Sequence, residues 1–308
     1  MPMYRQNILR GPGALRLGGA GAPWIIPHEN WEANVDPKTF DVQTNLGGLL
    51  DTRKDDVVGK ITFVPLGLVA LFDVLFPAIY RAPDIGASVF GASDTPCLCH
   101  SKAGKLVTFH CAALTKPPDL VLSATKTLYG QAEITALVKN NSAPNHDNSF
   151  FTLSNAALPA LPVNKSHVIT WPWSAAWGTT WPEIYAKDGW TVSVEPEIEY
   201  VQVDDVGTVD GLLKSVMITA KCRPLNVGEE EILDALRIQG DGADRGASLS
   251  LGQTLTIDGA FTLTINDAIL LRGPIRYGSV ELRAGEIAFV GQRDTSESLN
   301  GGVLFDYS

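Results

Sequence analysis

The stretch NWEANVDPKTFDV, residues 30–42, decides the fold of this chain, because the chain carries it twice in related form. Four of its residues return at a constant offset, the repeat spacing, as the pairs Trp31 and Trp190, Val35 and Val194, Asp36 and Glu195, and Pro37 and Pro196. Further landmarks return at nearly the same spacing: Pro65 as Pro224, and Gly86 as Gly246. These eight positions define the repeat: Trp31, Pro37, Pro65, Gly86, Trp190, Pro196, Pro224 and Gly246.

The repeat predicts two copies of one domain. We expect a first domain with an N-terminal arm over residues 1–145, a linker over 146–166, a second domain over 167–295 and a C-terminal tail over 296–308. Each copy has an ordinary domain size, and two copies are too few for a solenoid. Because duplication lets one chain occupy two equivalent places in a symmetric object, the repeat indicates an assembly protein.

Composition is that of a globular protein, with 45% hydrophobic and 19% charged residues. The net charge of −10 argues against a conventional DNA-binding protein, although not against a surface that DNA slides past. No apolar run is long enough to span a membrane, so no membrane insertion is expected. The start of the chain lacks the apolar core of a signal peptide. The four cysteines give no disulfide framework, so we expect synthesis in a reducing cytoplasm.

The local pattern predicts a mainly β fold with one helix in each copy. Residues 60–64 alternate as a half-buried strand does, and Leu71, Phe72 and Leu75 follow at helical spacing until Pro77 ends the helix. In the second copy we expect a helix from Asn226 to about residue 237. The segment over residues 46–59, which is apolar first and charged afterwards, predicts a long loop, with residues 204–213 as a shorter counterpart.

Catalytic chemistry finds little support in the sequence. Ser88 follows Gly86 and Ala87 but does not fit the nucleophile motif Gly-x-Ser-x-Gly, and His146 has no nucleophile to orient. We therefore expect a structural turn at Ser88, no catalytic residues and no enzyme activity.

A metal site is the weaker of two interpretations of the cysteines. Cys97, Cys99 and His100 could join Cys111 across a hairpin, but structural zinc sites use Cys-x2–4-Cys pairs. Buried thiols fit better, and we expect neither a metal nor a cofactor.

Five tryptophans cluster at the start of the second copy: Trp171, Trp173, Trp177, Trp181 and Trp190. Buried, they fill the core of that copy; exposed, they anchor an interface or stack on sugars. Because Trp190 has a repeat partner in Trp31, we favour the core, followed by an interface and then by sugar binding.

Five segments together resemble the major tail tube proteins of long-tailed phages. They are NILRGPGALRLGG (7–19), NWEANVDPKTFDV (30–42), GKITFVPLG (59–67), GASVFG (86–91) and GKLVTFHCAALTKPPDLVLSATKTLYGQAEITAL (104–137). The resemblance covers most of the first copy. It rests on the order of the five segments rather than on any single motif. It implies two tandem β-barrel or sandwich domains, each with one flanking α-helix, in a virion protein made in the host cytoplasm. Its rings would stack into a channel for genome ejection.

The resemblance also implies partners and contact residues. The chain would assemble with itself, with a tape measure protein and with a tail terminator, while genomic DNA passes through an acidic lumen without specific binding. A long loop would reach the next ring, with candidates Leu46, Leu49, Leu50, Asp51, Arg53, Lys54, Asp55, Asp56, Asp204, Asp205 and Asp210. Most family members carry one tube domain and form hexamers, so a duplicated chain predicts trimeric rings with pseudo-sixfold symmetry.

Two other functions fit parts of the sequence. A distal tail or baseplate ring protein has a similar fold, and a two-module carbohydrate-binding protein would use the tryptophans. Tubes or rings in electron microscopy would favour an assembly protein, and monomers with sugar affinity would favour the carbohydrate-binding protein.

Overall fold

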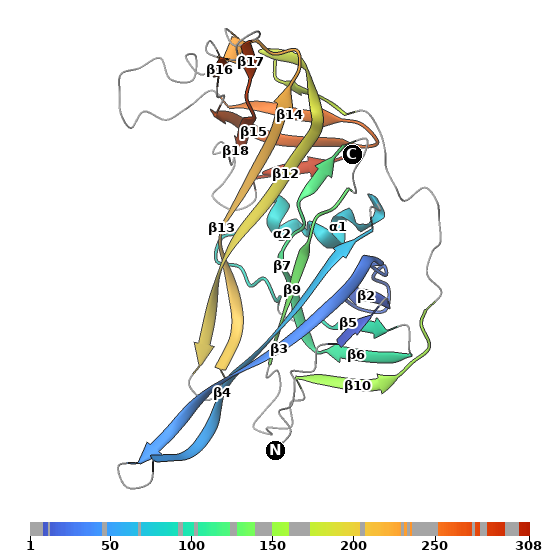
Figure 1. The fold of residues 1–308 in the computed structure, drawn as a ribbon, viewed down its shortest axis with the longest axis vertical. Helices are drawn as coiled ribbons and strands as arrows, with labels where there is room; N and C mark the ends of the chain where they lie inside the picture. Colours follow the sequence, from blue (N-terminus) through green and yellow to red (C-terminus); the bar gives the residue numbers. More distant parts are fainter. Residues whose placement is uncertain are drawn as a thin grey trace.

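The computed structural model describes residues 9–11, 13–44, 48–66, 69–91, 95–101, 104–123, 128–138, 150–159, 173–203, 207–228, 231–232, 235, 252–272, 275–277, 282–292 and 302–308. Over these residues the fold is mainly β, which confirms the predicted class (Figure 1). Two long hairpins dominate it. Hairpin 1 is β3 (Pro27–Thr44) with β4 (Gly48–Pro65), and hairpin 2 is β12 (Trp181–Val203) with β13 (Gly207–Pro224).

Hairpin 1 belongs to a five-stranded sheet in the order β1-β3-β4-β9-β7. The added strands are β1 (Leu9–Gly11), β7 (Cys111–Lys116) and β9 (Ala132–Leu137). A four-stranded sheet, β10-β6-β5-β2, lies in the same part of the molecule (Figure 1). It consists of β2 (Gly13–Leu17), β5 (Cys97–Ser101), β6 (Lys105–Phe109) and β10 (Phe151–Asn155).

Hairpin 2 belongs to an eight-stranded sheet that contains the path β11-β14-β15-β18-β13-β12-β8. Its other strands are β8 (Leu120–Leu122), β11 (Ser174–Trp177), β14 (Gln253–Asp258), β15 (Thr262–Arg272), β18 (Ile287–Gly291) and β19 (Phe305–Tyr307), which pairs with β15. β11 pairs with β12 as well as β14, so this sheet curls back on itself. β16 (Ile275–Tyr277) and β17 (Leu282–Ala284) form a separate small hairpin.

The helix expected to end at Pro77 is not one continuous helix, and three short helical pieces occupy this region, the last of them after Pro77. They are the 3-10 turn η1 (Val69–Leu71), α1 (Phe72–Leu75) and α2 (Ala78–Arg81). Pro77 separates α1 from α2 and is the N-cap of α2, since proline fits the start of a helix but not its interior. Of the helix expected from Asn226, the described residues Glu231, Ile232 and Ala235 are helical.

The larger of two hydrophobic clusters among the described residues runs through both parts of the chain. Alternation in the hairpins turns Trp31, Ala33 and Ile61 inward in hairpin 1, and Trp190 and Val192 inward in hairpin 2. All five belong to one contact cluster. The two expected domains therefore share buried contacts rather than standing on separate cores.

The main difference from the prediction concerns the two expected loops, because most of their residues lie in strands. Residues 48–59, expected in a loop, are the first two thirds of β4, and residues 207–213 open β13. The connections between the strands, 45–47 and 204–206, are equal in length, so the second one is not the shorter. The reason is pairing: Arg53 lies opposite Phe40 and Asp51 opposite Val42, so backbone bonds to the partner strand override the low strand propensity of charged residues.

Two smaller differences concern segment boundaries. The expected linker contains β10, which pairs with β6 through Phe151 and Phe109. The expected C-terminal tail contains β19, which pairs with β15 through Phe305 and Ile265. Each segment therefore extends the sheet of the copy that precedes it.

Candidate assembly interface

The two hairpins have the same strand register. Every residue pair between β3 and β4 has a counterpart between β12 and β13, displaced by the repeat spacing. Trp31 opposite Phe63 becomes Trp190 opposite Cys222, and Thr44 opposite Gly48 becomes Val203 opposite Gly207. A one-residue slip would turn every side chain to the other face, so a shared register means a shared division between core and surface.

The irregularities repeat as well. In hairpin 1 the register shifts after Lys38 and after Val42, and in hairpin 2 it shifts at the equivalent positions, after Glu197 and after Val201. The neighbouring strands also have matching shifts, after Leu114 where β7 pairs with β9 and after Leu270 where β15 pairs with β18. Such bulges bend and twist a strand locally, so the two hairpins are bent at equivalent positions.

The first half of the chain docks on hairpin 2 through strand β8. Leu120, Val121 and Leu122 pair with Val192, Thr191 and Trp190 on the outer edge of β12. Gly189 permits this approach, because its φ is +86° and a Cβ atom there would overlap the Leu122 carbonyl oxygen. The eight-stranded sheet therefore includes a strand from the other half of the chain.

A second contact joins residues 86–89 to β13. Gly86 and Val89 donate backbone hydrogen bonds of 2.8 Å to the carbonyl oxygens of Leu213 and Gly211. The Ser88 hydroxyl donates to the Asp210 carboxylate at 2.6 Å. The predicted structural turn at Ser88 thus has a specific use, since it holds the first half of the chain against hairpin 2.

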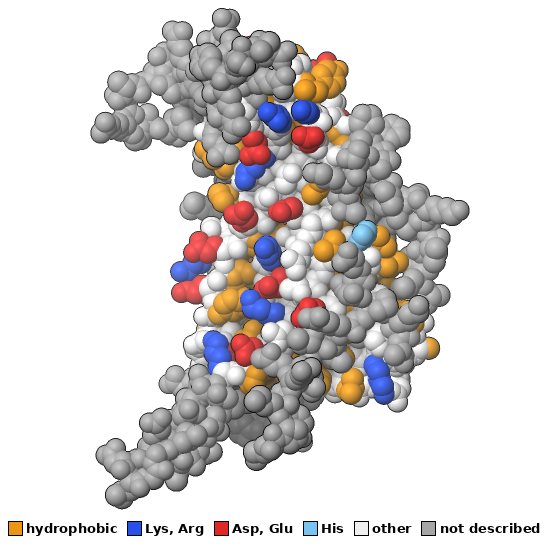
Figure 2. All heavy atoms as spheres, viewed as in Figure 1, with side chains coloured by type: hydrophobic (Ala, Val, Ile, Leu, Met, Phe, Trp, Pro, Cys, Tyr) orange, Lys and Arg blue, Asp and Glu red, His pale blue; other side chains and the backbone are white. Residues whose placement is uncertain are grey.

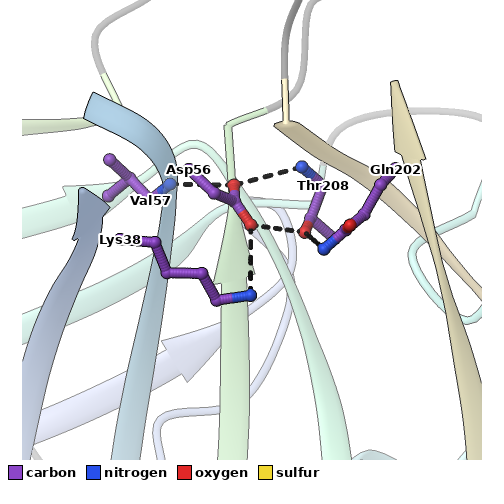
Figure 3. Close-up of polar contacts among 5 residues, drawn as sticks. All are labelled: Lys38, Asp56, Val57, Gln202 and Thr208. Carbon is purple, nitrogen blue, oxygen red and sulfur yellow. Dashed lines mark hydrogen bonds and ion pairs between the residues drawn. The ribbon is translucent and has the colours of Figure 1, made fainter. Parts of the chain in front are cut away.

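A third contact is polar and buried between the hairpins (Figure 3). Asp56 of β4 is 4% exposed and accepts hydrogen bonds from the Thr208 hydroxyl at 2.6 Å and from the Thr208 amide at 3.1 Å. The Val57 amide also donates to it, at 2.8 Å, and the Lys38 ammonium lies 3.8 Å away. Burial acts to raise the pKa of Asp56, but the hydrogen bonds from Thr208 and Val57 and the Lys38 charge outweigh it and lower the pKa below its usual value.

The helical turns form a fourth contact, with the end of the chain. Arg81 of α2 forms ion pairs of 3.0 Å with Asp73 and with Asp306 of β19. The Phe72 ring packs against Tyr307 at 3.9 Å and lies edge-on to Phe305 at 6.5 Å. These contacts attach the helical turns of the first half to the sheet of the second half.

The outer face of the hairpins is polar and carries both charges. Glu32, Asn34, Asp36 and Lys38 alternate along β3, and Lys60 on β4 donates to Glu133 on β9 at 3.0 Å. The equivalent positions of hairpin 2 include Glu195 and Glu197 on β12 and Lys221 on β13. Figure 2 shows acidic and basic side chains interspersed on one face of the molecule. The outer face was expected to be acidic, but its described residues carry both negative and positive charges.

A groove of about 290 Å³ lies on this face where the two hairpins meet. Asp36, Lys38 and Lys60 line it from hairpin 1, and Tyr200, Gln202 and Thr208 line it from hairpin 2. Its lining combines polar side chains with apolar surface that includes Val58. The groove lies beside the buried Asp56–Thr208 contact. The groove marks the seam between two equivalent hairpins.

The predicted contact residues divide into three groups. Leu46, Asp204 and Asp205 lie outside the described residues, as does the repeat position Gly246. Leu49, Leu50, Asp51, Arg53, Lys54 and Asp55 occupy strand positions in β4. Asp56 and Asp210 lie in the contacts between the halves, and sequence reasoning missed Thr208, their neighbour in the same seam. The only sequence feature that pointed to Thr208 was its position as a polar residue beside a predicted turn.

The cysteines and tryptophans are buried where they are described. Cys97, Cys99 and Cys111 are buried, and no group of three potential metal ligands occurs among the described residues. Trp173, Trp177, Trp181 and Trp190 are 1–7% exposed, which confirms the prediction that they belong to the core. Trp171 lies outside the described residues. The four described rings are therefore not available to stack on a sugar.

No protein-family model matches the chain, and no curated protein matches it at a significant level. Among the described residues, no helix has the length and apolar character needed to cross a membrane.

Proposed function

We propose that this protein is a structural virion protein whose rings stack into the tail tube of a long-tailed phage. The repeated register of the two hairpins, with its bulges in equivalent places, is the observation that carries the proposal. Two units with one geometry can take equivalent positions around a single axis. In this proposal the chain is a tandem pair of tube domains, each a β-barrel or sandwich with its own flanking helix, and three chains complete a ring of six domains.

The contacts within one chain supply a pattern for contacts between chains. Ser88 and Asp210 join the first half to hairpin 2. Both residues recur in the sequence: Ser88 as Ser248, after Gly246 and Ala247, and Asp210 as Asp51. Asp51 also holds the register position in β4 that Asp210 holds in β13. Repetition of both partners supports a head-to-tail contact in which the second half of one chain meets hairpin 1 of the next.

The polar outer face is our candidate for the channel lining. Its opposite face packs on the core, and Asp36, Lys38, Glu195 and Glu197 on it are exposed. Apart from Asp56, which is buried between the hairpins, this side is open to water and to DNA. Acidic groups such as Glu195 and Glu197 repel phosphates. Of the lysines on this face, Lys38 and Lys60 are paired with Asp56 and Glu133. Genomic DNA would pass without specific binding, and a tape measure protein and a tail terminator would complete the assembly.

The alternatives make different predictions. A distal tail or baseplate ring protein would form single rings that do not stack into tubes. A carbohydrate-binding protein would need exposed aromatic rings, and the four described tryptophans of the cluster are buried. We therefore place the tail tube first.

Electron microscopy of the purified protein with two matched variants tests the proposal. The wild-type chain should form tubes. Asp210→Ala should lower the melting temperature of the unassembled chain, because it removes the Ser88 contact within the chain. Asp51→Ala should leave that melting temperature nearly unchanged and reduce tube formation. Wild-type monomers at high concentration, or full tube assembly by Asp51→Ala, would count against the proposal.

A further inference from the structure

Strands β1 and β8 lie on equivalent edges. β1 pairs antiparallel with Trp31, Glu32 and Ala33 of β3. β8 pairs antiparallel with Trp190, Thr191 and Val192 of β12, which are the same three positions displaced by the repeat spacing. The outer edge of each hairpin thus has one site for an added short strand. Hairpin 2 fills its site with a strand from the other half of the chain, and hairpin 1 fills its site with the N-terminal segment.

The second half of the chain has its own equivalent of β8. β8 follows shortly after the bulge that ends at Lys116, and β16 follows shortly after the equivalent bulge that ends at Arg272. Each strand is followed by a return segment: Leu120 bridges to Tyr129, and Ile275 pairs with Ala284 of β17. Within the described residues β16 pairs with β17 alone, whereas β8 also pairs with β12.

We propose that β16 of one chain adds to β3 of a second copy and displaces β1 from that edge. This inference rests on the proposed ring-forming function and names the segments that join one chain to the next. The junction between chains then repeats the β8–β12 junction within a chain. β1 acts as a temporary cover for the edge of hairpin 1 until a second copy arrives.

Strand exchange of this kind requires little change in hydrogen bonding. An exposed strand edge is a template for uncontrolled pairing, so a cover protects the single chain. Three antiparallel pairs to β1 are replaced by three antiparallel pairs to β16 at the same residues, Trp31, Glu32 and Ala33. The backbone bonds lost and gained are therefore of the same kind. The net stabilisation of the assembly then comes from the other contacts that form between the two chains.

A disulfide that holds β1 in place provides the first test. The Val121 amide donates to the Leu128 carbonyl, away from β12, so Val121 and Thr191 form a pair without mutual hydrogen bonds. Arg10 and Glu32 are the equivalent pair. Such pairs have Cα atoms about 4.5 Å apart, within the range that a disulfide can bridge. The native cysteines are buried and interfere little with added ones.

Arg10→Cys with Glu32→Cys should lose assembly when oxidised and regain it when reduced. Val121→Cys with Thr191→Cys is the matched control, and its disulfide should leave assembly intact because β8 stays on β12. Circular dichroism and the melting temperature show whether each oxidised chain is folded. Equal assembly by the oxidised and reduced Arg10–Glu32 variant would overturn the exchange.

Cross-linking between chains provides the second test. Glu32→Cys combined with Arg276→Cys or with Tyr277→Cys should give covalent chain-to-chain products on a non-reducing gel. Microscopy of the same samples separates this inference from the proposed function. Tubes without cross-linked chains from either variant would overturn the inference alone. Cross-linked chains without tubes would support it and count against the tail tube, and monomers without cross-links would overturn both.

Discussion

At the residue scale, the Asp56 carboxylate is buried between two sheets because donors from both hairpins hold it. Val57 and Lys38 belong to hairpin 1, and Thr208 supplies two donors from hairpin 2. The acid was visible in the sequence, as part of the Asp55-Asp56 pair, but its partner was not. A hydrogen bond between residues so far apart along the chain has no local signal, since it depends on how the two hairpins pack.

Replacing the Thr208 hydroxyl should destabilise the chain. Thr208→Val keeps the shape and removes the 2.6 Å donor to Asp56. We expect the free energy of unfolding to fall by about 1–3 kcal/mol, because a buried charged acceptor loses a partner. Urea unfolding followed by tryptophan fluorescence measures the change.

The control for this variant is Ser215→Ala, which removes a hydroxyl that donates to Glu197 on the exposed face. A change within about 0.5 kcal/mol is expected there, as for most surface substitutions. Similar losses in both variants would mean that the Asp56 contact has no special role.

Stability should also depend on the protonation of Asp56. Its pKa is lowered in the folded chain, so the carboxylate contributes stability that is fully present above the unfolded pKa of about 3.9 and is lost as pH falls through the lower, folded pKa. The wild type should therefore lose more free energy of unfolding than Asp56→Asn between pH 6 and strongly acidic solution. Unfolding curves measured across this range, giving a constant difference between the two proteins, would contradict the shift.

At the element scale, the long strands were partly predictable and the short ones were not. Trp31, Val35 and residues 60–64 showed strand periodicity, and Pro77 marked the break between helical turns. The charged end of hairpin 1 suggested a loop because Asp, Lys and Arg favour strands weakly. Strands β8, β10 and β19 are short, and their existence depends on partners far along the chain.

The β8–β12 junction should be sensitive to one glycine. Gly189→Ala places a methyl group against the Leu122 carbonyl at a φ of +86°, so both sterics and backbone conformation oppose it. A loss of more than about 1 kcal/mol in the free energy of unfolding is expected. Gly19→Ala, at a position with no atom within 4 Å of the new Cβ, is the control. Thermal melts of both variants settle the comparison, and an unchanged Gly189→Ala melt would mean that β8 does not stabilise the chain.

At the scale of the whole molecule, the sequence repeat has a counterpart in the two hairpins, but it did not predict the way the two halves of the chain join. The repeat spacing extends from sequence to strand register. The shared core, with Phe72 of the first half against Phe305 and Tyr307, could not be inferred from repeated motifs. Hydrophobic residues in a sequence indicate that a surface is buried, but they do not show which part of the chain covers that surface.

The charge of the outer face should decide whether assembled tubes retain DNA. Glu195→Lys with Glu197→Lys reverses two acids on the outer face of hairpin 2. Tubes of this variant should bind duplex DNA at low salt and release it as salt rises, whereas wild-type tubes should not bind. Glu195→Gln with Glu197→Gln should fall between them. Asp258→Lys, on β14 and separated from hairpin 2 by strand β11, should match the wild type. Equal DNA binding by all four proteins would exclude this face as the lining.

One chain should fill two equivalent positions of a six-domain ring. Cryo-electron microscopy of the assembled protein tests this most directly, because the two hairpins differ enough in sequence to be told apart in a map. We predict three chains per ring, with hairpins 1 and 2 alternating around the channel and their polar faces turned inward. A ring of six chains, or a channel lined by only one of the two hairpins, would contradict this arrangement.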